Sequence, residues 1–490
     1  MPVQPRTPPG VLELLPPQQL AFQRMLDIIR RGFERFGFVP VETPVFELTK
    51  VLLTKSGGDT EKQVYFVQST GALKQAEDGG AELPELALRF DLTVPLARYV
   101  AEHEPQLNFP FRRYQIQRVY RGERAQKGRY REFYQCDIDV IGKDTLPLEH
   151  DADIPAVIYD IFDKLAPQLG LGRFKIYINN RKLLRGLLES LEFAEENHAH
   201  ILHEIDRVGK QDANVIAGGL VDGPNLLAGG IDPAKQARNV STLFDLIAEH
   251  GREARATLEA LRRFERPSPT LLDGIDELGR VYDGVLALGV PESALQINLA
   301  IARGLDYYTG TVYETLLDDH PKLGSICSGG RYDNLAGHYT KSKLPGVGIS
   351  IGATRLFSQA LELAKTQSRP ILGAAPQAVA HVIILAVEPA MTLELSALAT
   401  MLRDGGLNVE VYRGQDALGK QLKYADRSRI PLAVLYGSRE EENGVVMVKN
   451  LRETVSTKQL AVPLAELVPG IKRILAGQAL ETVHSASTAG

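Results

Sequence analysis

Hydrophobic residues recur at helical spacing near the start of the chain and then at strand spacing. After Pro16, apolar positions three and four residues apart predict a helix that ends at Gly37. Residues 39–47 alternate as a strand does but contain Pro44, which cannot donate a hydrogen bond to a neighbouring strand. We therefore expect this strand at the edge of a sheet or at an interface.

The clearest strand pattern lies between Arg112 and Asp139, where apolar and charged residues alternate on both sides of a short polar loop. From Arg112 to Arg131 the chain carries eight lysines or arginines against a single acid, Glu123. Such a hairpin repels itself unless anions lie beside it, and phosphate is the obvious anion. On composition, a merely solvated basic surface is an equal alternative.

The middle of the chain changes character twice. Residues 150–170 predict a helix and residues 174–180 a strand, whereas residues 181–290 read as a helical insertion rich in Leu, Ala and Glu. Strand composition returns at 295–315, and a glycine-spaced strand within 344–357 runs into a further helix. The pattern is that of a sheet interrupted by a long helical segment.

The insertion contains three closely spaced histidines, His198, His200 and His203. Their separations do not bring all three to one face of a helix, as a shared metal would require. A solvated helix is therefore expected here rather than a metal site.

A second unit of different composition follows. Residues 366–378 read as a linker, and residues 379–476 alternate between strands and helices, which predicts a mostly parallel sheet. Residues 477–490 are expected to be a disordered tail. The second helix of this unit has a modest basic face, formed beside Asp426 by Lys420, Lys423, Arg427 and Arg429.

Length and composition bound the class of protein. With 490 residues, two or three domains are expected, and a net charge of −5 means that any nucleic-acid surface is local. The two cysteines, Cys136 and Cys327, exclude a disulfide framework and a cysteine-based zinc site. Because no signal pattern and no membrane-spanning apolar run are found, a cytoplasmic protein with no membrane partner is expected.

Three arginines, Arg121, Arg303 and Arg355, lie near the ends of predicted strands or helices, where they offer fixed donors to carboxylate or phosphate. The chain has no Walker P-loop, Ser/His/Asp set or nucleophile elbow, which argues against a covalent protein nucleophile. Arginines with a few carboxylates suit in-line attack of a substrate carboxylate on a phosphate, with catalysis by positioning and charge stabilisation.

An acidic interruption, Asp91-Leu92-Thr93, falls within an otherwise apolar strand. A carboxylate at such a place needs a partner, for example an ammonium group. Alternatively, Asp91 caps the helix that begins near Pro95. Both roles remain open at this point.

These motifs, in this order, resemble the histidyl-tRNA synthetases of class II. YRGER with its basic loop and FYQCDID resembles motif 2, the segment at 344–357 resembles motif 3, and ARGLDYYTG at 302–310 is close to a signature confined to this family. The resemblance implies an α+β catalytic domain with an antiparallel sheet over 1–365, the helical insertion, and a C-terminal α/β anticodon-binding domain over 379–476. It also identifies the first helix and the strand at Pro44 with motif 1, which forms the homodimer interface in the family.

The resemblance implies roles for the residues that would bind ATP and catalyse the reaction. Arg121 and Arg303 would be catalytic, holding the α-phosphate and neutralising its developing charge, while Arg355 would grip the γ-phosphate. Arg129 would reach the outer phosphates or the acceptor end of the tRNA, and Glu123 the adenine end or a metal. ATP with Mg²⁺ is the expected nucleotide substrate, and no tightly bound organic cofactor is expected.

A second set of residues would bind L-histidine. The ammonium group would meet Asp91, Thr93 and Gln135, and the carboxylate would meet Arg121 and Arg303. The two imidazole nitrogens would meet Asp139 and Tyr308. The pocket would be shaped by Leu92, Tyr307 and Tyr332. Such a pocket rejects apolar side chains because they leave buried polar groups unpaired, so no editing domain is required.

The implied function is histidine–tRNA ligase, with tRNA(His) as partner. Asp91 and Asp139 stand where many bacterial members carry glutamate. Because aspartate is one methylene shorter, backbone or water must bring these carboxylates nearer to the ligand. Three rivals remain: a regulatory paralogue of ATP phosphoribosyltransferase, another class II synthetase, and a plain RNA-binding protein. The paralogue typically lacks the C-terminal unit and the signature arginines, other synthetases lack ARGLDYY here, and dispersed arginines argue against a basic RNA-binding stripe.

Overall fold

The computed structural model of the chain separates into two compact units, residues 1–13 with 24–373 and residues 14–23 with 374–490. The structure describes residues 3–53, 63–70, 84–124, 128–208, 211–248, 253–302, 304, 308–333, 336–369, 371, 378–388, 390–452 and 459–478. Each unit has its own sheet and its own hydrophobic core.

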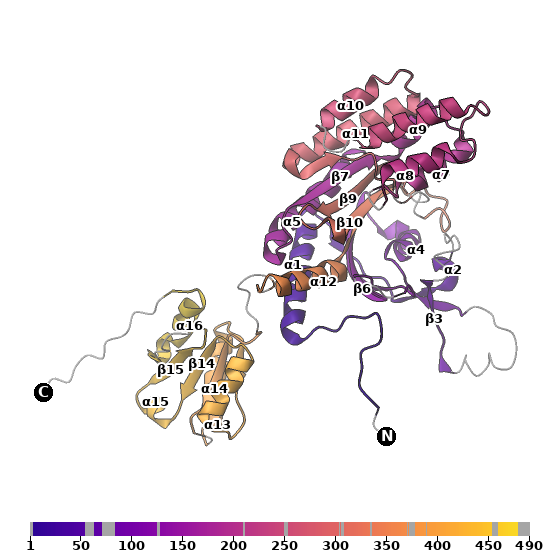
Figure 1. Ribbon diagram of the computed structural model, residues 1–490. Coiled ribbons are helices and arrows are strands. Elements are labelled where there is room, and N and C mark those ends of the chain that lie inside the picture. Colours follow the sequence, from indigo (N-terminus) through magenta and orange to yellow (C-terminus); the bar gives the residue numbers. More distant parts are fainter. Residues whose placement is uncertain are drawn as a thin grey trace. The chain divides into compact units, whose positions relative to one another are not determined.

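The first unit is built on an eight-stranded sheet in the order β1-β5-β6-β11-β10-β9-β7-β8 (Figure 1). The pairings from β5 to β7 are antiparallel, whereas the two edge strands β1 and β8 pair in parallel. This confirms the expected antiparallel sheet. The strands are β1 (Val39–Pro40), β5 (Phe111–Tyr120), β6 (Glu132–Ile141), β7 (Phe174–Asn180), β8 (Leu295–Ile297), β9 (Thr311–Leu317), β10 (Cys327–Tyr332) and β11 (Gly346–Gly352).

Helices cover this sheet where its strands present apolar side chains. Helices α5 (Glu149–Leu169) and α12 (Ala353–Thr366) contact β6, β7 and β11. Helix α1 (Pro16–Arg35) brings Phe33 to Tyr114 of β5, with ring centroids 5.8 Å apart. Because side chains alternate along a strand, Cys136 and its apolar neighbours on β6 face one side while the polar residues between them face the other. The polar side of β6 is thereby left to the site.

A small three-stranded sheet lies beside the first strands. It consists of β2 (Phe46–Leu48), β4 (Leu86–Leu88) and β3 (Tyr65–Val67), all antiparallel, with helices α2 (Thr49–Leu52) and α4 (Thr93–His103) nearby. The predicted strand at 39–47 is thus split, with β1 in the large sheet and β2 in the small one. The fully buried Arg89 joins the two sheets, since it donates to the carbonyl oxygens of Thr43 at 2.6 Å and of Arg118 at 2.9 Å.

Between β7 and β8 the chain forms a set of helices, gathered beside β7 in Figure 1. They are α6 (Arg181–Ser190), α7 (Glu195–Ile205), α8 (Ala213–Val221), α9 (Pro233–Ala248), α10 (Ala254–Arg262) and α11 (Pro269–Ala287). The expectation of a solvated helix around the three histidines is wrong for His198, which is buried with its ring nitrogen 3.1 Å from the Phe193 carbonyl oxygen. His200 and His203 are exposed.

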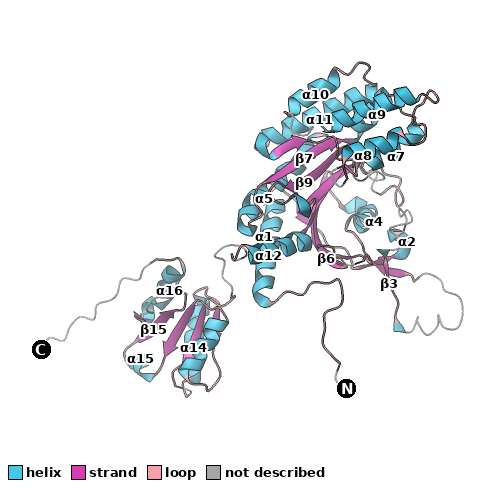
Figure 2. Ribbon diagram, in the orientation of Figure 1, coloured by secondary structure: helices cyan, strands magenta, loops and turns pink. Residues whose placement is uncertain are grey.

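The second unit has a five-stranded sheet in the order β13-β12-β14-β15-β16, with helices on both of its faces (Figure 2). Only the pairings of β12 with β13 and β14 are parallel, so the expectation of a mostly parallel sheet is wrong for β15 and β16. The reversal follows α15, where Gly444 adopts a φ of +62° and turns the chain back beside β14. The elements are β12 (Val382–Ala386), α13 (Thr392–Asp404), β13 (Val409–Val411), α14 (Leu418–Arg427), β14 (Leu432–Tyr436), α15 (Ser438–Glu442), β15 (Val445–Asn450), β16 (Leu460–Pro463) and α16 (Leu467–Leu475).

Short 3-10 helices complete the chain at η2 (Glu104–Gln106), η3 (Glu292–Ala294), η4 (Pro321–Leu323) and η5 (Leu464–Glu466). Of the helices in the described ranges, none has the length and apolarity needed to cross a membrane.

The register of β6 against β11 generates the first prediction. It sets Gly348 opposite Asp139, and a Cβ at Gly348 would lie 2.1 Å from Asp139 Oδ1 and 2.5 Å from the Ile138 carbonyl oxygen. Gly348→Ala must therefore push strands apart, and we expect the free energy of unfolding to fall by about 1–3 kcal/mol. Chemical denaturation measures this change.

Gly218 in α8 provides the matched control, because a Cβ there meets nothing within 4 Å. Gly218→Ala should leave stability unchanged or raise it by about 0.5–1 kcal/mol. Equal effects of the two substitutions would contradict the close approach at Gly348.

Candidate active site

Two adjoining cavities open on the polar side of β6. The larger, of about 360 Å³, is lined by three arginines, Arg121, Arg129 and Arg355. The smaller, of about 40 Å³, is lined by polar and aromatic residues that include Asp137, Asp139 and Tyr308. Ser328 of β10 and Ser350 of β11 line both cavities, so whatever occupies one lies next to the occupant of the other.

Arg121 is fixed at the end of β5. Its Nε donates to the Phe90 carbonyl oxygen at 3.0 Å, and its guanidinium carbon lies 5.2 Å from the centroid of the Phe133 ring. Arg355 comes from the first turn of α12 and donates to the Leu323 carbonyl oxygen. Both guanidinium groups are thus held at the cavity by backbone oxygens, which reduces the entropy lost on binding an anion.

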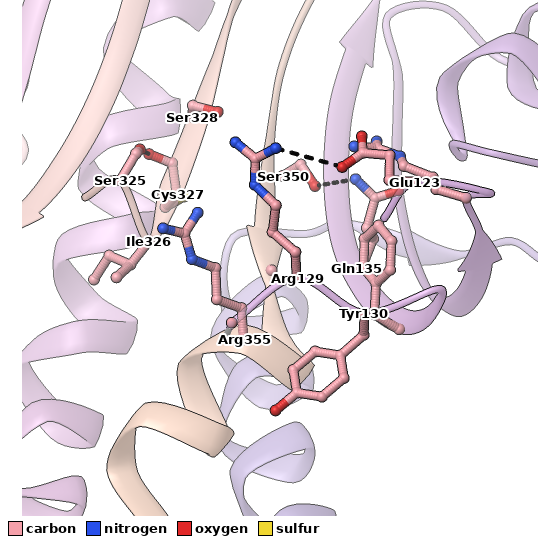
Figure 3. A pocket seen from close by; sticks show the side chains of 14 residues that line it. Glu123, Arg129, Tyr130, Gln135, Ser325, Ile326, Cys327, Ser328, Ser350 and Arg355 are labelled. Carbon is pink, nitrogen blue, oxygen red and sulfur yellow. Dashed lines mark hydrogen bonds and ion pairs between the residues drawn. The ribbon is translucent and has the colours of Figure 1, made fainter. Parts of the chain in front are cut away.

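Arg129 and Glu123 come from the loop between β5 and β6. Their side chains approach to 3.6 Å, and Arg129 remains 65% exposed. Figure 3 shows Arg129 and Arg355 extending toward the same cavity, with Glu123 beside Arg129. Among the described lining residues, three guanidinium groups face one carboxylate, and this positive excess suits a polyphosphate.

Gln135 and Ser350 form the boundary between the two cavities. Gln135 Nε2 donates to Ser350 Oγ at 3.0 Å, as Figure 3 shows, and Ser350 is in turn hydrogen-bonded to the Asp137 carboxylate. Gln135 Oε1 is buried and has no hydrogen-bond partner among the described residues. An acceptor of this kind is available to a donor on a bound ligand.

The smaller cavity is built around a buried ion pair between Arg113 and Asp139, which face each other directly across β5 and β6. The hydroxyl of Tyr332 donates to Asp139 Oδ1 at 2.9 Å. Burial raises the pKa of Asp139, and the Arg113 charge and the Tyr332 hydrogen bond oppose that rise. Asp139 is therefore an already satisfied carboxylate in the wall of the cavity.

Asp137 is a site residue that the sequence reasoning missed, together with Arg113, Ser328 and Ser350. It lies between Gln135 and Asp139 on the same side of β6 and is 4% exposed. Burial raises its pKa to about 7, with a further rise from the carboxylates of Asp139 and Asp91, while Arg113 and Ser350 act in the opposite direction. Strand alternation alone could have found Asp137, since every second residue shares a face.

The Asp91-Leu92-Thr93 segment enters helix α4 beside these cavities. Asp91 Oδ1 accepts a hydrogen bond from the Val94 backbone N–H at 3.1 Å, so the capping role is present, and burial raises its pKa. Thr93 lines the smaller cavity. Leu92 is fully buried in the core and is not among the residues that line either cavity.

The remaining predicted residues divide into two groups. Tyr308 and Tyr332 both line the smaller cavity, and burial is the main cause of the raised pKa of Tyr308. Arg303 and Tyr307 lie outside the described residues. Of the three arginines expected around one ligand, the structure brings Arg121 and Arg355 to a common cavity.

The donor groups limit what metal the larger cavity could hold. Among the described residues that line it, Glu123 is the single carboxylate, and the described ranges contain no cluster of three His, Cys, Asp or Glu side chains suited to a metal. One carboxylate beside a surface rich in arginine fits Mg²⁺ of the kind that keeps most of its waters and binds through the phosphates of a ligand. These donors are too few to enclose a metal ion with protein ligands alone.

Comparison with known proteins covers both units. A family model described as histidyl-tRNA synthetase matches residues 10–356, and one described as an anticodon binding domain matches residues 381–474. The chain is 57% identical over 456 residues to a protein of Xanthomonas axonopodis pv. citri named histidine–tRNA ligase, with 92% of each chain covered. It is 55% identical over 452 residues to a protein of that name from Stenotrophomonas maltophilia, covering 92% of this chain and 94% of the relative.

The fold is also similar to that of solved structures. The crystal structure of histidyl-tRNA synthetase from Nostoc sp. PCC 7120 matches with a TM-score of 0.82 at 36% identity, covering 96% of this chain and 100% of the other.

The raised pKa of Asp137 predicts a pH-dependent effect on stability. A folded-state pKa of about 7, above the ordinary value of 3.8, means that stability present at low pH is lost as pH rises through 7. Asp137→Asn removes this loss. The melting temperature of the variant minus that of the unsubstituted protein should therefore be ~5 °C larger at pH 8 than at pH 5. Calorimetric melting at both pH values measures the difference.

Asp319→Asn is the control, because Asp319 is exposed and its pKa is lowered by hydrogen bonds to Arg173. The melting temperature of this variant minus that of the unsubstituted protein should not be larger at pH 8 than at pH 5. A flat difference for Asp137→Asn as well would show that the carboxylate is not desolvated.

Proposed function

The chain belongs to the histidyl-tRNA synthetase family, and we propose that it is a histidine–tRNA ligase whose two adjoining cavities hold ATP and L-histidine side by side. It activates histidine with ATP to histidyl-adenylate and pyrophosphate, and then transfers histidine to the 3′ end of tRNA(His). The observation that carries this proposal is the shared wall of Ser328 and Ser350 between an arginine-lined cavity and a carboxylate-lined one.

In the first step the histidine carboxylate attacks the α-phosphate in line with the departing pyrophosphate. Arg121, anchored by the Phe90 carbonyl, is placed to hold the carboxylate and the α-phosphate together. Arg129 and Arg355 take the outer phosphates, where charge grows as pyrophosphate leaves. The family resemblance gives Arg303 the charge that develops at the α-phosphate. Mg²⁺ at Glu123 and the phosphate oxygens would neutralise negative charge on the nucleotide.

Histidine is held by groups on both sides of Ser350. The unpartnered Oε1 of Gln135, with Thr93 and Asp91, receives the ammonium group. Asp139 and Tyr308 face the ring, and Tyr332 orients Asp139. By resemblance, Tyr307 completes the pocket. Leu92, buried behind this segment, positions it through the core rather than by contact with the cavities.

The other partners follow from the second unit and from the first strands. Residues 379–476 bind the anticodon of tRNA(His) through the exposed basic face of α14.

The motif 1 region, with Phe46 half exposed on β2, forms a homodimer, which light scattering would report as twice the chain mass of 53.9 kDa. The protein works in the cytoplasm, where tRNA and ATP are available.

Arg121→Ala tests the adenylation step. We expect histidine-dependent ATP–pyrophosphate exchange to fall by about 10²–10³-fold, the usual loss when a group that stabilises transition-state charge is removed. The control is Arg118→Ala, which removes an arginine of the same strand that pairs with Glu132 instead of lining either cavity. No exchange by the unsubstituted protein would favour a regulatory role, and exchange with another amino acid a different synthetase.

Charge reversal on α14 tests the tRNA contact. Lys423→Glu with Arg427→Glu should raise the KM for tRNA by ~10-fold or more. It should also make this KM less dependent on salt concentration, because a protein with fewer cations displaces fewer counterions from the tRNA. Amino acid activation should be unchanged. Lys472→Glu on α16 is the control for a general change of charge in this unit. Unaltered aminoacylation by the α14 variant would place the tRNA elsewhere.

A further inference from the structure

Asp137 is a buried carboxylate to which the mechanism above gives no task. It is 4% exposed, it lines the smaller cavity, and its Oδ1 has no hydrogen-bond partner in the described part of the chain. The Asp137 carboxylate is hydrogen-bonded to Ser350, which is itself held by Gln135, and it also lies in the electrostatic field of Arg113. A buried acceptor left open in this way calls for a donor from outside the protein.

The neighbouring Asp139 is already satisfied. Its two oxygens meet the Arg113 guanidinium and the Tyr332 hydroxyl, both supplied by the protein and both buried. Arg113 acts on both carboxylates, but its direct ion pair is with Asp139, and a ligand donor gains less from an acceptor already in contact with a buried cation. Among the residues that line the smaller cavity, Asp137 is the carboxylate without a direct ion pair in the described ranges.

We infer that Asp137 Oδ1 accepts a hydrogen bond from an imidazole N–H of bound histidine, and that Asp137 is a specificity-determining residue for the amino acid. This inference rests on the proposed function and assigns to Asp137 a contact that the sequence motifs assign to Asp139 alone. Ser350 holds the carboxylate in place from the side that faces the larger cavity.

The position of Asp137 selects the ring rather than the ammonium group. The carboxylate of histidine must face the larger cavity because it attacks the α-phosphate there, and the ammonium group is attached to the adjacent carbon. Gln135 lines that larger cavity, and Thr93, also given to the ammonium group, lines the smaller one from the start of α4. Asp137 lines the smaller cavity from β6, together with Tyr308 and Tyr332 of the ring pocket. The side chain of the amino acid is therefore the part that reaches Asp137.

The contact explains discrimination as well as affinity. An apolar side chain of similar size would leave Asp137 Oδ1 desolvated and without a donor, whereas Asp139 would keep its protein partners. A ring with a donor nitrogen removes this penalty, and a positively charged ring compensates the carboxylate as well.

The test compares Asp137→Ala and Asp137→Asn with the unsubstituted protein in ATP–pyrophosphate exchange. We expect the KM for histidine to rise by ~10–100-fold in Asp137→Ala and less in Asp137→Asn, which keeps an acceptor oxygen, with the KM for ATP unchanged. An unchanged KM for histidine in both variants, or an equal rise in the KM for ATP, would overturn the inference.

Ring-methylated histidines distinguish the ring from the ammonium group. Methylation of the nitrogen that faces Asp137 removes the proposed donor, so the preference of the unsubstituted protein for histidine over one of the two methyl isomers should shrink by ~10-fold or more in Asp137→Ala. An unchanged preference for both isomers would assign Asp137 to the ammonium group and contradict the inference.

Cys136→Ala is the matched control, since it alters the adjacent buried residue of β6 on the opposite side of the sheet. It should leave the preference among histidine and its methyl isomers unchanged. The two proposals fail differently: absence of histidine-dependent exchange in the unsubstituted protein overturns the function, whereas normal exchange with no effect at Asp137 overturns this inference alone.

Discussion

The buried ion pair between Arg113 and Asp139 is the interaction on which the site depends. Burial of carboxylates disfavours their charged form, and here two of them, Asp137 and Asp139, lie on the same side of one strand. Arg113, fully buried on the neighbouring strand, supplies the opposing charge. Such a pair contributes little net stability but is costly to break from one side, so it fixes β5 against β6 in a single register.

That register divides one surface into regions of opposite charge. Arginines from the strand end, the loop and α12 surround the larger cavity, while carboxylates from the middle of β6 line the smaller one. The division matches a reaction that brings a polyphosphate and a basic amino acid together. Apart from Arg129 and Glu123 of the loop, these groups come from strands, strand ends and a helix terminus, so most of the alignment exists before either substrate binds.

The sequence predicted the long, strongly periodic elements well, including β5, β6, β7, α5 and α12, because their hydrophobic patterns are local. It did not predict the small sheet, whose strands are three residues long and depend on Arg89 reaching carbonyl groups far away in the chain. The sequence analysis also missed Asp137, although strand alternation puts it on the same side of β6 as Asp139. Only the structure shows that Arg113 pairs with Asp139 and leaves Asp137 Oδ1 without a hydrogen-bond partner among the described residues. The roles of Arg303 and Tyr307 stay predictions.

The boundary that Ser328 and Ser350 share between the two cavities has a consequence for the proposed reaction intermediate. In the proposed reaction, histidine and the adenylyl group become one ligand as pyrophosphate leaves. This ligand would occupy both cavities, so it would dissociate only when both sets of contacts break together. We therefore expect the adenylate, which would contact both cavities, to stay bound far longer than ATP or histidine alone. A long residence time would keep the labile mixed anhydride away from bulk water until the tRNA arrives.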